Sequence, residues 1–333
     1  MKKKFFSYQQ IFLFVISLSF CFYLLGYDNF NFSNQSWLIN GDLAQYQLGW
    51  KFYREDIWRF PLGLNPNYGI SNSSSIIYSD SIPLFAIFFK IFRSFLFEEF
   101  QYFSFWIFIC IYLQALFSFK IIFYFTKNIS YSLVSSLFFI FSSILIYRSG
   151  IHLSLTAHWL ILGYFYVQIS ALNNKDLKKH SIIYLSLFIH FYFSIILISV
   201  FFIEKIIKLK KFFIKDLLSL FVLIILSLTL MYVVGYFTIK IDDGLGFGYG
   251  IYNFNLNSFF NPIGENHAEK FNWSFFFPTL NFQNKEMEGF SYLGISGILF
   301  LLIYFIYLVN GKSKIIFSKK VNIIIFFVFL IMA

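Results

Sequence analysis

The sequence predicts an all-α integral membrane protein, and three observations support this. Hydrophobic residues make up 59% of the chain and charged residues 13%, about half of the roughly 25% charged share of a soluble domain. The apolar residues form long blocks, most of about 17–26 residues, enough for a helix to cross a hydrocarbon core of about 30 Å. The charges gather between these blocks.

Each apolar block is expected to form a helical span, giving a bundle of about eight to nine transmembrane helices within a single polytopic domain over residues 1–333. The blocks lie at roughly 11–26, 81–97, 101–126, 131–147, 155–171, 182–203, 214–239, 291–309 and 321–333. The last block has 13 residues, too few to span a membrane at about 1.5 Å per residue. The chain is therefore expected to be truncated at its C-terminus.

Lysine-rich segments set the expected orientation. Lys2–Lys4, together with the loops at 204–216 and 310–320, place the N-terminus and both loops in the cytoplasm. The polar segments 27–80 and 240–290 then form two extracytoplasmic loops on the inner (cytoplasmic) membrane. The net charge of +10 follows this loop pattern, so it predicts orientation rather than nucleic-acid binding.

One segment conflicts with simple counting of the spans. Asn173–His180 carries three lysines but falls outside the cell, while Arg148 falls near the cytoplasmic side. A broken or re-entrant helix among the middle blocks would move residues 148–158 outward and reduce both conflicts. The sequence leaves this open.

The stretch that starts at Asn40 is the first candidate for chemistry. Asn40-Gly41-Asp42 is typical of a helix start. On the helix that follows, Asp42, Gln45, Tyr46 and Gly49 share one face at i, i+3, i+4 and i+7. Asp42 is either a reactive carboxylate or the cap of an interfacial helix.

Two more carboxylates lie at expected membrane boundaries. Asp80 is either a second acid or metal ligand facing Asp42, or the N-cap of the next span, with Pro83 in its first turn. Glu288 is either functional or marks a helix start.

Arg148, His152 and His158 lie within eleven residues of a chain that has five histidines. Charged groups at membrane depth usually face a cavity or a partner, and the planar guanidinium of arginine suits phosphate. The alternative is ordinary snorkelling by the arginine, with the histidines capping helix ends. The two histidines do not have the i, i+4 spacing of helical metal ligands, so a zinc site on this pair is not expected.

Several stretches together resemble a bacterial family of multi-spanning membrane proteins related to GT-C glycosyltransferases and YfhO-like sugar transferases. They are "GDLAQYQLGW", "FPLGLNPNYG", "SSIIYSDSIPLFA", "FQYFSFW", "HLSLTAHWLIL" and "EGFSYLG", spread over residues 41–294. The resemblance implies a GT-C-like bundle whose first outer loop carries the catalytic acid, at the position of Asp42. It implies a polyprenyl-phosphate sugar donor. One Asp stands where some branches have paired acids, so a divalent cation is possible but not required, and the cofactor is unknown.

The sequence therefore predicts a membrane glycosyltransferase that moves a sugar from a polyprenyl-phosphate donor to a glycan or lipid acceptor of the cell envelope, on the extracytoplasmic face. Its partners are these substrates and membrane lipid, with no nucleic acid. The alternatives are a lipid-linked sugar flippase or transporter, and a non-catalytic envelope-assembly protein. The expected catalytic residues are Asp42, as general base, and Asp80; the expected substrate-binding residues are Gln45, Tyr46, Arg148, His152, His158 and Glu288.

Overall fold

The computed structural model of the chain describes residues 2–69, 74–170, 172–207, 214–238, 256–266, 269–280 and 291–309. The chain divides into two compact units. The first comprises Met1–Ile140, Tyr147–Phe202 and Lys211–Lys240, and the second Phe141–Ile146, Ile203–Lys210 and Ile241–Ala333. The single membrane domain over 1–333 stays a prediction.

Helices make up the first unit. In chain order they are α1 (Lys2–Leu25), α2 (Gly41–Glu55), α3 (Pro83–Ile91), α4 (Phe103–Thr126), α5 (Ile129–Ile140), the later part of α6 (Ser143–Ile151), α7 (Trp159–Ile169), α8 (Lys175–Leu187), most of α9 (Phe191–Ile207) and α10 (Ile214–Val234).

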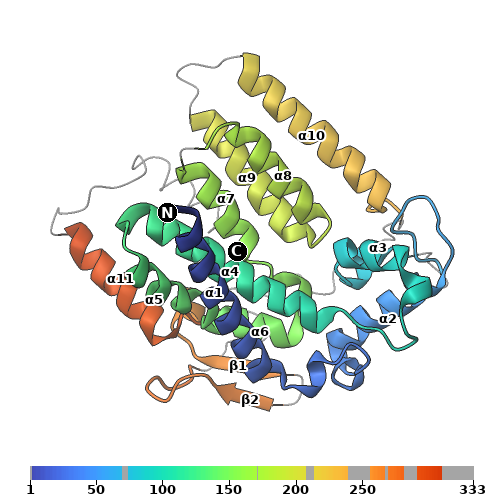
Figure 1. The fold of residues 1–333 in the computed structure, drawn as a ribbon, viewed down its shortest axis with the longest axis horizontal. Helices are drawn as coiled ribbons and strands as arrows, with labels where there is room; N and C mark the ends of the chain where they lie inside the picture. Colours follow the sequence, from blue (N-terminus) through green and yellow to red (C-terminus); the bar gives the residue numbers. More distant parts are fainter. Residues whose placement is uncertain are drawn as a thin grey trace. The chain divides into compact units, whose positions relative to one another are not determined.

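Helix α4 lies at the centre of this unit, because α1, α5 and α7 all pack against it (Figure 1). Its start is fixed by Gln101, whose Oε1 accepts the backbone N–H groups of Phe103 at 2.8 Å and Ser104 at 3.3 Å, donors that the first helical turn leaves without partners. Its end is fixed by Lys127, which adopts the left-handed conformation and donates its N–H to Phe123. The bundle is therefore assembled around one well-capped apolar helix.

Among the residues that the structure describes, three helices are long and apolar enough to cross a membrane: Tyr8–Leu25 within α1, α4 and α10. Helices α5 and α6 add a fourth candidate as a pair bent by 46°. The helical class that the sequence predicts is confirmed, and three to four candidate spans agree with a membrane protein; the count of eight to nine spans stays a prediction.

Two predicted spans are wrong as single crossings. The block at 81–97 folds as α3, nine residues long, which is about 14 Å at 1.5 Å per residue and too short to cross. The block at 182–203 is interrupted at Phe188, where α8 ends, and helix resumes at Phe191. The lysine-rich segment expected as a loop at 173–180 lies largely within α8.

The first long polar segment is a folded structure. Leu64 and Ser75 form an antiparallel bridge that closes its return loop, and Ser75 Oγ donates to the carbonyl of Gly63 at 3.0 Å. The N–H of Leu62 bonds the carbonyl of Val233 at the end of α10, at 2.8 Å. These bonds fix the return loop, and Asn65 Nδ2 joins it to α2 by donating to the carbonyl of Gly49 at 2.9 Å.

The second unit contains the two strands of the described residues. Strand β1 (Ile263–Asn266) pairs antiparallel with β2 (Glu269–Asn272), with Ile263 opposite Asn272. Helix α11 (Gly294–Val309) follows, and Ser143 Oγ donates to the carbonyl of Tyr292 just before it.

Candidate functional site

Asp42 lies in the first turn of α2 and pairs with a histidine. The N-cap is Asn40, in an extended conformation and without a side-chain cap. The Oδ2 of Asp42 lies 3.3 Å from Nδ1 of His152. His152 follows α6 directly, and Trp106 of α4 fixes the chain after it by donating Nε1–H to the carbonyl of Leu153 at 2.7 Å. The sequence separation of 110 positions is thus closed by α4. The alternative that Asp42 is the N-cap is wrong, because Asn40 takes that position.

Asp80 lies in a strained turn between a short 3-10 helix (η3, Ile76–Ser79) and α3. Both Asp80 and Ile82 have φ of 52°, and a β-branched residue rarely adopts this left-handed region. The N-cap of α3 is Ile82, so the interpretation of Asp80 as this cap is wrong. Pro83 begins α3, as predicted. Strain of this kind is often found at functional sites.

Buried hydrogen bonds hold this turn in place. Ser81 Oγ donates to the carbonyl of Tyr46 on α2 at 2.7 Å, and the hydroxyl of Tyr102 donates to the carbonyl of Ser81. Gln45 Nε2 donates to the carbonyl of Tyr78 at 3.2 Å. Gln45 therefore supports the turn that presents Asp80, while its predicted contact with substrate stays a prediction.

His190 is the residue that the sequence interpretation missed. It lies in the break between α8 and α9, and its Nε2 is 3.5 Å from Oδ1 of Asp80. The N–H of Leu84 bonds the carbonyl of Phe188 at 2.7 Å and brings this break to the start of α3. A histidine inside an apolar block was itself a signal, because ionisable groups at membrane depth are costly.

Asp42, Asp80, His152 and His190 form what we call the Asp–His cluster. The charges of Asp42 and His152 both act on Asp80, so the two pairs lie within electrostatic range of each other. The side chains of His152 and His190 are 11% and 12% exposed, and those of Asp42 and Asp80 are 37% and 38% exposed. The carboxylates are thus the accessible groups, and buried imidazoles orient them.

Three more predicted residues lie around the cluster. The charge of Arg148 acts on Tyr46, His158 and His190. Tyr46 is 2% exposed, and burial raises the pKa of its phenol. Tyr46 is therefore a neutral donor and acceptor beside both carboxylates. Glu288 lies outside the described residues.

The surroundings of Asp80 favour its protonated form. Burial raises the pKa of the Asp80 carboxyl to about 6; the charge of His152 lowers it, and that of Asp42 raises it. The titratable groups near Asp80 also include His190 and the phenols of Tyr46, Tyr68 and Tyr236. At neutral pH the folded protein would therefore be more stable if Asp80 carried no charge.

Asp80→Asn is therefore expected to stabilise the protein in a pH-dependent way. Because the pKa is raised in the folded state, the cost of ionisation is absent below about pH 4, grows between pH 4 and 6, and is complete above that range. Asparagine also tolerates the left-handed conformation. The measurement is thermal unfolding in detergent. The melting temperature of the variant should equal that of wild type at pH 4 and exceed it at pH 7. Glu55→Gln, an exposed carboxylate of α2, is the control, and a difference that does not change with pH would contradict the assignment.

The described residues contain no group of three or more His, Cys, Asp or Glu arranged to hold a metal ion. The cluster offers two accessible carboxylates as proton acceptors, with a guanidinium and a phenol nearby. Such a set can deprotonate a hydroxyl and stabilise an anion.

One family model matches residues 14–333 of the chain, and it is described as "Domain of unknown function (DUF6311)". The chain belongs to this family. No curated protein and no solved structure matches it significantly.

Proposed function

We propose that this member of the DUF6311 family is a membrane glycosyltransferase with a GT-C-like bundle. It moves a sugar from a polyprenyl-phosphate donor to a glycan or lipid acceptor of the cell envelope, on the extracytoplasmic face of the bacterial inner membrane. The observation that supports this best is the Asp42–His152 pair, an accessible carboxylate oriented by a buried imidazole.

The proposed topology has a cytoplasmic N-terminus and eight helical segments in the bundle. Helix α3 is too short to cross, so the chain stays outside from the end of α1 to the start of α4. Helix α4 then returns it to the cytoplasm, the bent pair α5–α6 leads it out, and the apolar stretch Leu153–Ile169, which contains α7, leads it back. Helices α8 and α9 form a hairpin that begins and ends in the cytoplasm, and α10 and α11 are the last two helical segments.

This topology removes both conflicts of the simple count. Residues 148–158 come after an outward crossing and lie on the same side as Asp42, as their contacts require. The lysines of residues 173–180 come after α7 and lie in the cytoplasm, in agreement with the positive-inside rule. The turn at His190 points outward, which agrees with its contact to Asp80.

Cysteine labelling from outside intact cells tests this arrangement. Asn67→Cys should react with a membrane-impermeant maleimide, and Lys178→Cys should react only after the cells are opened. Both positions are exposed, and the native thiols Cys21 and Cys110 are 0% exposed, so they give little background. Labelling of Lys178→Cys in intact cells would favour the simple count of spans and refute the proposed topology.

Asp42 acts as general base in the proposed reaction. Its carboxylate accepts the proton of the acceptor hydroxyl while that oxygen bonds the anomeric carbon of the donor sugar. The bond between the anomeric carbon and the phosphate oxygen breaks, and its electron pair leaves with the polyprenyl phosphate. His152, 3.3 Å away, orients the carboxylate and supports the proton transfer.

Arg148 and His158 are assigned to the departing phosphate. The guanidinium can bind two phosphate oxygens at once, and the charge that develops on them favours a fixed cation nearby. Arg148 acts electrostatically on His158, which places both in one neighbourhood. Tyr46 and Asp80 lie beside Asp42 and are assigned to the sugar and acceptor hydroxyls.

The function is tested by comparing the envelope glycans of a deletion strain with and without the wild-type gene. Loss of one sugar, restored by the gene, supports the proposal. Purified protein in nanodiscs should also release polyprenyl phosphate from a lipid-linked sugar when acceptor is present. A flippase would move the intact donor across a proteoliposome membrane without releasing polyprenyl phosphate, and that result would replace the proposal.

A further inference from the structure

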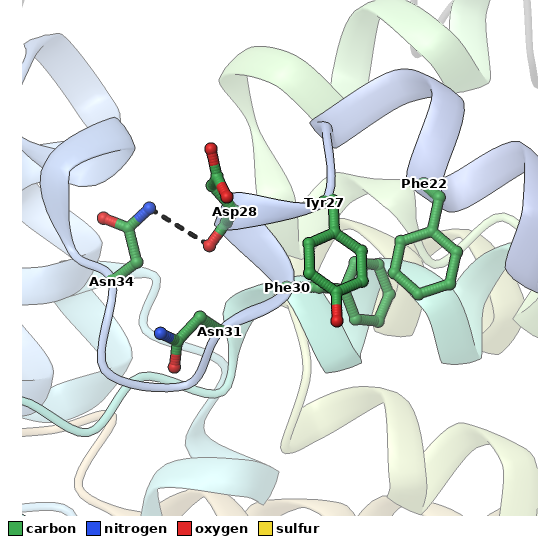
Figure 2. Close-up of a pocket in the computed structure, with 6 residues that line it drawn as sticks. All are labelled: Phe22, Tyr27, Asp28, Phe30, Asn31 and Asn34. Atoms are coloured by element: carbon green, nitrogen blue, oxygen red, sulfur yellow. Dashed lines mark hydrogen bonds between the residues drawn. The ribbon is translucent and has the colours of Figure 1, made fainter.

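A pocket of about 510 Å³ opens at the end of α1, in the same polar segment as Asp42 but lined by other residues. Its lining is Phe22, Tyr27, Asp28, Phe30, Asn31 and Asn34. Figure 2 shows the three aromatic rings together on one side and Asp28 with the two asparagines on the other. A pocket of this volume is within the usual range for small ligands.

The aromatic side offers a flat apolar surface. The rings of Phe22 and Tyr27 stack at 5.7 Å with 29° between their planes, and Phe22 also lies 4.6 Å from Phe30. The side chain of Tyr27 is 79% exposed, so much of this surface is open to a ligand. The face of such an aromatic ring can pack against the apolar C–H face of a ligand ring.

The polar side supplies both an acceptor and a donor. The Asp28 carboxylate accepts hydrogen bonds. Asn31 Oδ1 accepts from Ser33 N at 3.1 Å and Ser33 Oγ at 2.8 Å, an arrangement that turns its Nδ2 donor away from Ser33. Hydroxyl groups need both kinds of partner, because each donates and accepts.

Side-chain hydrogen bonds hold the pocket in a fixed conformation. Asn34 Nδ2 donates to the carbonyl of Asp28 at 3.1 Å (dashed in Figure 2), and Asn29 Nδ2 donates to the carbonyl of Leu25 at 2.7 Å. Gln101 Nε2 donates to the carbonyls of Asn29 and Asn31 at 3.3 and 3.1 Å. A rigid site loses less entropy when a ligand binds.

Charge narrows the class of ligand. Among the six lining residues, all in the described part of the chain, Asp28 alone is charged, and it is negative. A phosphate headgroup would need a cation there and is disfavoured. A quaternary ammonium group would contact the rings and the carboxylate, but it offers no acceptor for the Asn31 Nδ2 donor. A neutral polyhydroxylated ring uses all of these groups.

We propose that this pocket is a saccharide subsite that holds one sugar ring of the acceptor glycan, with its C–H face on Tyr27 and its hydroxyls on Asp28 and Asn31. The role in the acceptor rests on the proposed glycosyltransferase function. The binding itself does not, because it follows from the pocket alone.

The experiment is saturation-transfer NMR on the full chain in phosphatidylglycerol nanodiscs, with chitotetraose, cellotetraose and mannotetraose as probes. At least one probe should receive saturation at its ring C–H protons. Tyr27→Ala and Asp28→Asn should each weaken its binding by about tenfold, the size of one lost anchor contact. Tyr23→Ala should not, because Tyr23 is 83% exposed but does not line the pocket.

Three results would overturn the subsite: no probe bound above empty nanodiscs, equal binding by Tyr27→Ala, or displacement of the probe by phosphocholine. If Tyr27→Ala loses the probe but still transfers sugar as wild type does, the subsite stands and its role in the acceptor fails. If wild type binds the probe but transfers no sugar, the subsite again stands and the proposed function fails.

Discussion

Asp42→Asn is expected to reduce sugar transfer by about 10²–10⁴-fold, the usual contribution of a positioned general base. Asparagine has almost the shape of aspartate and can still hydrogen-bond His152, whose Nδ1 lies 3.3 Å from the Asp42 carboxylate in the wild-type protein. The asparagine amide cannot accept a proton at neutral pH. The loss should appear in the rate of the chemical step. The amount of protein in the membrane should not change, because Asp42 does not cap its helix.

The measurement is the glycan composition of a deletion strain complemented with wild type, Asp42→Asn or Glu55→Gln at equal protein levels. Glu55 belongs to the same helix and is exposed, so it matches the change in charge without touching the cluster. Wild type and Glu55→Gln should restore the missing sugar, and Asp42→Asn should not. Full restoration by Asp42→Asn would make its carboxylate dispensable and would move the transporter and scaffold alternatives ahead.

The face of α2 could be predicted from the sequence because it depends only on helical spacing. Asp42 and Tyr46 lie at the cluster, Gln45 bonds the turn before Asp80, and Gly49 packs under that turn. A period of 3.6 residues and one start signal were sufficient. The histidines could be noticed as a group, but their partners could not be assigned, since these depend on how α4 closes distant segments together.

The block at 81–97 shows why the span count could not be predicted reliably. The hydropathy of an apolar run reflects how favourably its residues transfer from water to lipid. It does not show whether the backbone forms one continuous helix. Two cations interrupt this run: Lys90 donates to the carbonyl of Ile57 at 3.2 Å, and Arg93 donates to the carbonyl of Asp56. These bonds tie the run to the end of α2. The same limit hid His190, because the block at 182–203 has unbroken hydropathy while its backbone breaks at residues 188–190.

Gly49→Ala is expected to destabilise the protein by about 1–3 kcal/mol, the usual cost of overpacking a filled site, and to displace Asp80. A Cβ on Gly49 would lie 2.2 Å from Ser79 Oγ and 2.3 Å from Ser79 Cβ. Both are part of the buried turn that carries Asp80, where Ser79 and Ser81 are 0% exposed. The substitution should therefore reduce both the melting temperature and sugar transfer.

Gly150→Ala is the matched control, because Gly150 is also helical and a Cβ there meets nothing within 4 Å. It should be neutral or stabilising by up to about 1 kcal/mol, the ordinary gain of alanine over glycine in a helix. Apparent melting temperatures at one scan rate compare the two variants.

Adding Ser79→Gly to Gly49→Ala removes the nearest contacts, so the double variant should recover part of the lost stability. If Gly49→Ala were instead as stable as Gly150→Ala, α2 would not be packed closely enough to hold the Asp80 turn. The inference that α2 positions both Asp42 and Asp80 would then be wrong.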